Sequence, residues 1–260
     1  PLPGLQALIH VTVAPGSAIN SGTIGFGLGP RINAAGRLDD AMTAVKLLTA
    51  RDPETAKELA EELNSANQER QALSQKIFEE AERQLAKQGP PEWSLVLGEE
   101  GWHPGVIGIV ASRMTEKYHL PSVLLSIDGE TAKGSCRSIP LLDLYQALDR
   151  CRDYLVQFGG HAQAAGLTIR TAEIPAFREA FARVVAEMLD HKPYEPAAVP
   201  DWFVPEDREI TPEAVAQLAQ MEPFGVGNPA PVLGFAKAQI QEVSLLGRDH
   251  NHLKFLLKQG

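Results

Sequence analysis

The chain has 260 residues, of which 44% are hydrophobic and 22% are charged, and its formal net charge is −9. This length can bury the core of one large domain or of two to three smaller ones, and no apolar run approaches the roughly 20 residues that span a bilayer. The acidic excess argues against a surface that coats nucleic acid nonspecifically, but it does not exclude a local basic cleft.

The cysteines and the N-terminal sequence indicate the cellular compartment of the protein. Cys136 and Cys151 are the two cysteines, and they do not form a C-x-x-C pair. A disulfide framework and a structural zinc site are therefore poorly supported. No basic-then-apolar signal precedes the first domain, so we expect a cytoplasmic protein with reduced thiols and no membrane contact. Because PLPGLQALIH contains no methionine, we also expect the chain to begin inside a longer protein.

Residues 1–51 combine short helical pieces with the glycine-rich stretch GTIGFGLGPRINAAGRLDDA, which we expect to form a loop. Small residues between Arg31 and Arg37 would let the backbone pack tightly while both guanidinium groups reach one side. Alternatively, Arg37 only pairs with Asp39 or Asp40 and serves the fold.

Residues 52–90 predict one long connecting helix. Asp52 is a suitable N-cap, Pro53 suits the first helical position, and strong helix formers follow. Apolar residues recur at mostly helical intervals along a polar rod. Gly89 and two prolines end the pattern.

Residues 91–192 alternate strand and helix patterns, which indicates an α/β domain with a mixed sheet. The expected strands are WSLVLG, PSVLLSI, AKGSCRS and AAGLTIR. The expected helices are PGVIGIVASRMTEKY, LLDLYQALDRCRDYLVQF, which would end at Gly159, and IPAFREAFARVVAEML. Residues 193–260 then form a proline-rich linker, one helix and at least two apolar strands, which suggests a truncated OB-like β-barrel segment.

The stretch GEEGWHPGVIGIVASRM suggests an anion site. His103 stands in a loop, and we expect Pro104 to open a helix whose free N–H groups point into that loop. The alternative is a capped helix with a buried Trp102 and an incidental histidine.

The stretch AKGSCRSIP suggests phosphate binding, because Ser135, Arg137 and Ser138 offer two hydroxyls and a bidentate guanidinium. On a strand, Ser135 and Arg137 would face the same side. The alternative is an edge strand with a solvated arginine.

The stretch FGGHAQAAGLTI places Gly159 and Gly160 before His161. We expect the glycines to end the preceding helix with positive φ. The small residues after His161 leave room for a substrate backbone, and the imidazole can bond a phosphate near pH 7. A structural histidine in a tight turn is the alternative.

Metal-ligating patterns are missing from this sequence. It contains no D-x-D, no paired histidines with carboxylates at ligand spacing, and no Walker or dinucleotide glycine loop. RDHNH has the composition of an exposed turn, so we do not assign zinc or nuclease roles to His250 and His252. We therefore predict a binding function and no metal site in this chain.

Four stretches, GFGLGPRINAAGRL, GWHPGVIGIVASR, GSCRS and FGGHAQAAG, occur in the same order as in the RecJ family and resemble its C-terminal half. RecJ proteins are single-strand-specific 5′→3′ DNA exonucleases of the DHH phosphoesterase superfamily. MEPFGVGNPAPVL is similar to the start of that family's OB-type domain. GGHxxAAG alone is shared with oligonucleotide and cyclic-dinucleotide phosphodiesterases and with alanyl-tRNA synthetases, whereas the first two stretches are more selective.

The resemblance implies a domain organisation. Residues 1–51 would be the C-terminal end of the DHH catalytic domain, 52–90 the connecting helix, 91–192 the DHH-associated substrate-binding domain and 193–260 a linker with a partial OB-like domain. The active site would lie in the cleft between the DHH and DHH-associated domains. Its manganese or magnesium ligands would precede Pro1, so this fragment would bind no metal and would be inactive alone.

The resemblance also implies a function, namely the substrate-binding part of an exonuclease of DNA repair and recombination. Ser135 and Arg137 would hold a terminal 5′ phosphate, and His161 would support the cleft near the scissile phosphate. The other substrate-binding candidates are Arg31, Arg37, His103, Ser138, Gly159 and Gly160. The implied partners are single-stranded DNA with a 5′ phosphate, a single-strand-binding protein and a helicase.

Other functions stay open at this point. One is a phosphodiesterase for short oligoribonucleotides or cyclic dinucleotides, against which the OB-like segment counts. Another is a noncatalytic tRNA-binding or protein-docking module, and the last is an α/β domain whose glycines and arginines only serve the fold.

Overall fold

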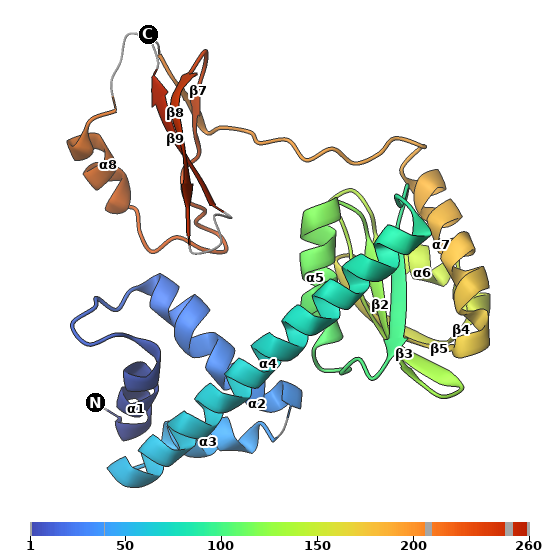
Figure 1. Cartoon of the computed structure of the whole chain (residues 1–260), viewed down its shortest axis with the longest axis horizontal. Helices are drawn as coiled ribbons and strands as arrows, with labels where there is room; N and C mark the ends of the chain where they lie inside the picture. The colour runs from blue at the N-terminus through green and yellow to red at the C-terminus, as the bar shows by residue number, and fades with distance from the viewer. Residues whose placement is uncertain (1, 39, 206–209, 248–251, 259–260) are drawn as a thin grey trace. The chain divides into compact units, whose positions relative to one another are not determined.

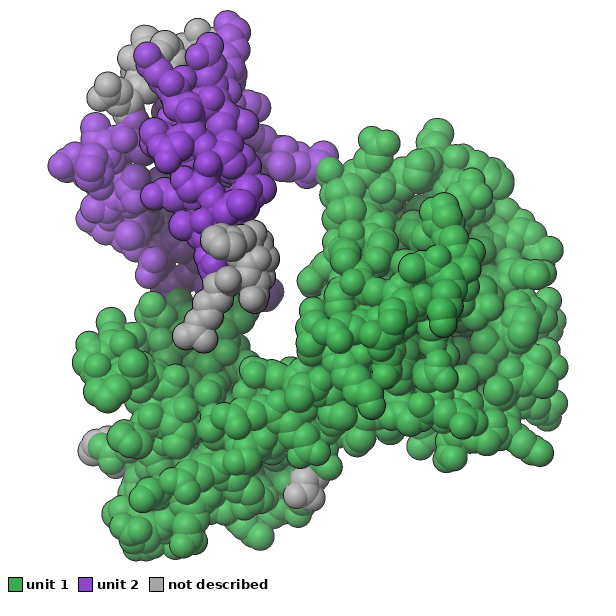
Figure 2. Space-filling model, viewed as in Figure 1, with its two compact units in different colours: residues 1–196 green, residues 197–260 purple. Residues whose placement is uncertain are grey.

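The computed structural model describes residues 2–38, 40–205, 210–247 and 252–258. The chain divides into two compact units, residues 1–196 and residues 197–260 (Figure 2). Each unit is described by itself below, with the helix and strand labels of Figure 1.

Four helical segments precede the long helix. They are α1 (Pro3–Thr12), the π-helix η1 (Thr23–Leu28), α2 (Gly29–Leu38) and α3 (Met42–Thr49). The expectation of a glycine-rich loop was therefore wrong, because most of that stretch is helical. Leu28, Ala34 and Ala35 are buried there, so tertiary packing outweighs the low helix propensity of the glycines. Pro30 is tolerated because it lies in the first turn of α2.

Helix α4 (Pro53–Gln88) confirms the predicted connecting helix. The Asp52 carboxylate accepts a hydrogen bond from the Thr55 N–H at 2.8 Å, and Gly89 ends the helix with φ 89°. Its 36 residues extend for about 54 Å at 1.5 Å per residue. The first half packs on α1, α2 and α3 around Leu63, and the second half packs on the α/β domain around Ile77.

A five-stranded mixed sheet forms the α/β domain, with the strand order β1-β2-β3-β5-β4. Its strands are β1 (Leu95–Glu100), β2 (Ser122–Asp128), β3 (Thr131–Arg137), β4 (Leu155–Gly160) and β5 (Ala164–Arg170). β1 and β2 are parallel, and the other neighbours are antiparallel. α4 and α5 (Ile107–Tyr118) cover one face, while α6 (Leu144–Asp149) and α7 (Ile174–Met188) cover the other (Figure 1). The predicted mixed sheet is confirmed.

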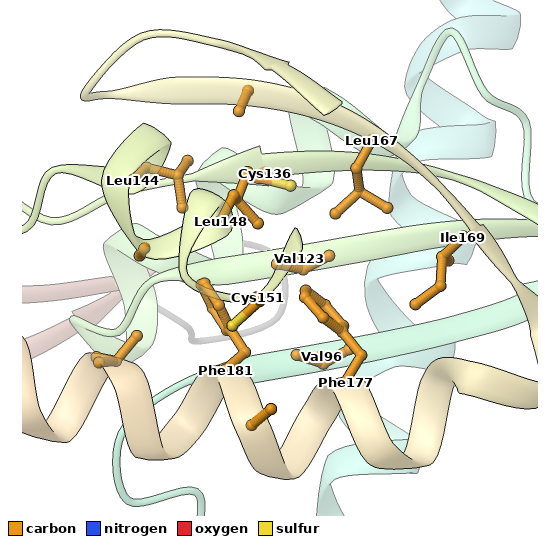
Figure 3. Close-up of a cluster of buried hydrophobic side chains, with 14 of the residues drawn as sticks. Val96, Val123, Cys136, Leu144, Leu148, Cys151, Leu167, Ile169, Phe177 and Phe181 are labelled. Atoms are coloured by element: carbon orange, nitrogen blue, oxygen red, sulfur yellow. The ribbon is translucent and has the colours of Figure 1, made fainter. Parts of the chain in front are cut away.

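The core beneath α7 is aromatic and aliphatic. Phe177 and Phe181 extend from α7 toward the sheet residues Val96 and Val123 (Figure 3), and their rings stack with centroids 5.5 Å apart. Each fully buried apolar side chain contributes about 1.5–3 kcal/mol relative to exposure. The alternation along β3 sends Cys136 into this core, so its neighbours Ser135 and Arg137 face the side of α5.

Two helix boundaries differ from expectation. The helix expected to end at Gly159 stops at Asp149, and a 3₁₀ turn, η2 (Arg152–Tyr154), leads into β4. Gly159 and Gly160 thus lie in a strand, because LVQFGG pairs with β5 and forms the edge of the sheet. Likewise, Pro104 lies in a turn and α5 begins at Ile107.

Residues 197–260 form the second unit. β6 (Trp202–Val204) pairs in parallel with β7 (Leu233–Phe235), and β8 (Gln239–Leu246) pairs antiparallel with β9 (His252–Lys258). Helix α8 (Pro212–Ala219) begins at the N-cap Thr211. Over its described residues this unit is a truncated OB-like segment with two two-stranded sheets and no closed barrel. None of the helices in the described ranges has the length and apolarity needed to cross a membrane.

Candidate functional site

The first unit contains a cavity of about 720 Å³ between α2, α3, α5 and β3. Polar and small residues line much of it, namely Asn33, Gly36, Arg37, Pro104, Gly105, Gly108, Ser135 and Arg137. The cavity therefore joins residues of the N-terminal helical segment to residues of the α/β domain.

Arg137 is the best-anchored charge in this cavity. Its Nε donates to Ser112 Oγ at 3.1 Å, and its Nη1 donates to Ser135 Oγ at 3.2 Å and to the Cys136 carbonyl at 2.8 Å. Its Nη2 has no hydrogen-bond partner among the described residues, so two N–H groups of the guanidinium stay available to a ligand. Burial lowers the pKa of Arg137; the Cys136 thiol opposes this shift, and the charge of Arg37 adds to it.

Arg37 supplies the second charge. It lies in the last turn of α2, and its Nη1 donates to the Gly105 carbonyl at 3.1 Å. Arg70 on α4 is held by Asn67, whose Oδ1 accepts from Arg70 Nη2 at 2.9 Å. Burial lowers the pKa of Arg70, and the charge of Arg37 lowers it further. Within the described ranges no carboxylate forms an ion pair with these arginines, so an anion would relieve their mutual repulsion.

Two glycines allow the elements around the cavity to approach closely. A Cβ added at Gly105 would lie 2.2 Å from the Arg37 carbonyl oxygen. One added at Gly108 would lie 2.8 Å from Ser135 Oγ and 3.1 Å from Arg137 Nη2. Sequence reasoning did not single out these glycines, because the residues that they approach, Arg37 for Gly105 and Ser135 for Gly108, are distant in the sequence.

Both candidate histidines have a fixed ring orientation. His103 Nδ1 accepts from the Gly105 N–H at 3.1 Å, and His161 Nδ1 accepts from the Gln163 N–H at 3.3 Å. An imidazole that accepts on Nδ1 carries its proton on Nε2, where it can donate to an anion. His103 lines a neighbouring cavity and His161 is exposed, so neither lines the cavity of Arg137.

The strand register extends the Ser135 face across the sheet. Ser135 is opposite Gly166, and Gly166 is opposite Gly159. Paired residues in an antiparallel sheet point to the same face, so this row is nearly free of side chains. Gly160 is constrained differently, because its φ is 151° and an added Cβ would lie 2.4 Å from the Ala164 carbonyl oxygen.

The remaining candidates lie elsewhere. Arg31 donates to Asn64 Oδ1 at 2.9 Å and to the Gly27 carbonyl at 3.0 Å, so it belongs to the helical packing. Ser138 Oγ donates to the Leu142 carbonyl at 2.8 Å.

The structure describes only some of the remaining acidic residues and histidines that the sequence analysis considered. Asp40 accepts from the Met42 N–H, while Asp39 and His250 lie outside the described residues. No group of three or more His, Cys, Asp or Glu residues that could hold a metal occurs where the structure is described.

Comparison with known proteins identifies the family. Residues 93–187 match the family model of the DHHA1 domain, and residues 204–260 match that of the RecJ OB domain. The chain is 36% identical over 257 residues to the single-stranded-DNA-specific exonuclease RecJ of Bacillus subtilis (strain 168), covering 98% of this chain and 33% of that protein. It is 34% identical over 265 residues to RecJ of Escherichia coli (strain K12), covering 98% of this chain and 45% of that protein.

Solved structures agree with the sequence comparison. The crystal structure of RecJ from Thermus thermophilus in complex with Mg²⁺ matches with a TM-score of 0.82 and 31% identity, over 98% of this chain and 39% of that one. A crystal structure of exonuclease RecJ bound to manganese matches with a TM-score of 0.61 and 36% identity, over 74% of this chain and 46% of that one. The chain thus spans less than half of the length of these relatives. We conclude that the chain belongs to the RecJ family, and that it matches the C-terminal part of its members.

Proposed function

We propose that this chain is the substrate-binding part of a metal-dependent 5′→3′ single-stranded DNA exonuclease, and that its cavity binds the terminal 5′ phosphate. One observation supports this most directly. Arg37 and Arg137 line one cavity without an ion-pair partner among the described residues.

The chemistry of the cavity suits a terminal phosphate better than an internal one. A terminal phosphate carries about −1.5 to −2 charges at pH 7 and has three free oxygens. The free Nη2 of Arg137, the Ser135 hydroxyl and Arg37 can each bond a different oxygen, and guanidinium groups fit such oxygens in pairs. Partial burial of Arg137 strengthens these bonds, because water screens them less.

The hydrolytic centre is proposed to lie in the rest of a longer protein. RecJ of Thermus thermophilus was crystallised with Mg²⁺ and with Mn²⁺. The described residues of this chain do not fit such an ion, because they contain no cluster of three ligands. We therefore assign residues 1–51 to the end of the DHH domain, 52–90 to the connecting helix, 91–192 to the DHH-associated domain and 193–260 to the OB-like domain.

The chain's own residues would bind and position the strand. The row of Ser135, Gly166 and Gly159 gives the DNA backbone room beside the phosphate cavity. His161 would donate from Nε2 near the scissile phosphate. Alone, the chain would bind DNA without cleaving it. We also propose that the longer protein acts in DNA repair and recombination. Its proposed partners are a single-strand-binding protein and a helicase.

Fluorescence anisotropy with a 3′-labelled single-stranded oligonucleotide tests the proposal. We expect a 5′ phosphate to tighten binding by about tenfold or more, since a charge-assisted hydrogen bond contributes about 1.5–3 kcal/mol. Arg137→Ala should abolish this preference. Arg152→Ala is the charge-matched control, because Arg152 is exposed and pairs with Asp149 away from the cavity.

Other outcomes favour other functions. Equal affinity for both oligonucleotides in the wild type would contradict the proposal. A preference for di- or trinucleotides of RNA over longer DNA would favour the short-oligonucleotide phosphodiesterase. Binding of tRNA that is indifferent to Arg137→Ala would favour the noncatalytic module.

A further inference from the structure

A second cavity of about 390 Å³ lies beside the phosphate cavity. Pro104 lines both, so the two cavities are neighbours on the same side of the sheet. The residues that line the second cavity are Gly101, Trp102, His103, Pro104, Ser126, Ile127, Asp128, Thr131 and Lys133.

The alternation of β3 links the two cavities. Lys133, Ser135 and Arg137 are alternate residues of β3, so all three point to the same face of the sheet. Lys133 and Arg137 are about 13 Å apart along the strand at 3.2–3.4 Å per residue. This separation lets the two cations contact different phosphates of one strand.

The polar groups of the second cavity are suited to an anion. Lys133 is exposed, and its ammonium group makes no hydrogen bond or ion pair with any described residue. His103 directs its Nε2 proton away from Gly105, because Nδ1 accepts from that residue's N–H. Ser126 is already engaged, since its Oγ donates to the Trp102 carbonyl at 2.5 Å. Asp128 is the one carboxylate among the residues that line this cavity.

We infer that this second cavity, through Lys133 and His103, binds an internal backbone phosphate of the strand whose 5′ phosphate occupies the first cavity. The inference rests on the proposed function and extends it. Two phosphate sites would distinguish a strand from a 5′-mononucleotide, which can fill only the first. Asp128 would weaken the second site by repulsion, because its carboxylate lines the same cavity.

Two variants of the whole chain test this inference, one that removes a positive charge from the second cavity and one that removes a negative charge. Lys133→Gln should weaken binding of a 5′-phosphorylated oligonucleotide about two- to fivefold, the range of one solvent-exposed ionic contact. It should also reduce the magnitude of the salt slope, d log K/d log [salt], by about 0.7, the value for one phosphate of a single strand. Asp128→Asn should tighten binding instead. Neither variant should change the affinity for a 5′-mononucleotide.

A chemical change in the DNA locates the contact. Three oligonucleotides would each carry one uncharged methylphosphonate, at the first, second or third internal linkage. With one of the three, wild type and Lys133→Gln should bind equally, because the phosphate that Lys133 contacts has lost its charge. Thermal melting serves as the folding control, and we expect wild-type melting temperatures because both side chains are exposed.

The outcomes separate the inference from the proposed function. If the 5′-phosphate preference is present but neither variant alters the affinity or the salt slope, the second site is wrong and the first stands. If the wild type has no 5′-phosphate preference, the proposed function fails and the second site fails with it.

Discussion

Replacing Gly108 by alanine should weaken phosphate binding and leave the stability of the domain nearly unchanged. Gly108 lies in the first turn of α5, buried against β3. The added Cβ would lie 2.8 Å from Ser135 Oγ and 3.1 Å from Arg137 Nη2. These are the hydroxyl and the guanidinium nitrogen that we propose to bind the 5′ phosphate.

The two effects of Gly108→Ala have opposite signs. Alanine is favoured over glycine in a helix by about 0.5–1 kcal/mol. The close contacts are with the ends of side chains, so Ser135 can rotate and Arg137 can shift at a similar cost. We therefore expect the free energy of unfolding to stay within about 1 kcal/mol of wild type. Displacing both groups should cost one charge-assisted hydrogen bond, which weakens binding of the phosphorylated strand about tenfold or more.

Urea denaturation followed by circular dichroism measures the first quantity, and anisotropy with phosphorylated and unphosphorylated oligonucleotides measures the second. Gly25→Ala is the matched control, because a Cβ at this helical glycine would meet nothing within 4 Å. If the Gly108→Ala protein keeps its stability and binds the phosphorylated strand like wild type, the cavity is not the phosphate site.

Two further predictions concern the sheet and the thiols. Gly160→Ala should destabilise the protein by about 2–3 kcal/mol in denaturant titration, because an added Cβ would lie 2.4 Å from the Ala164 carbonyl oxygen at φ 151°. Gly159→Ala should leave stability unchanged, since its Cβ would meet nothing within 4 Å, and equal stability losses in both variants would refute this account. Burial raises the pKa of the Cys136 thiol to about 12 and that of Cys151 to about 11, so a thiol reagent at pH 8 should modify both cysteines only after denaturation. Fast labelling of the native protein would show that the β3 core opens.

Local sequence signals predicted the parts of the fold that depend on neighbours along the chain. The cap of α4 joins Asp52 to Thr55, three residues away, and Gly89 ends the same helix. Propensity and capping act over this distance, so the sequence alone is sufficient. The same holds for β3, whose period of two predicts that Ser135 and Arg137 lie on one face.

Errors arose where a distant segment decides the conformation. LVQFGG was predicted to continue a helix, but it forms β4 because β5 offers its edge for pairing. The glycine-rich stretch was predicted to be a loop, but it is helical because Leu28 and Ala35 are buried against the first half of α4. Neither partner can be read from the segment itself.

The candidate site shows the same division. Residue type and motif order in the sequence selected Arg137, Ser135 and the RecJ family. The tertiary structure placed Arg37 in the cavity and Arg31 outside it, since the Arg37 contact with Gly105 joins residues 68 positions apart. A cavity assembled from two separate segments depends on how their backbones pack, and sequence spacing within either segment carries no information about that packing.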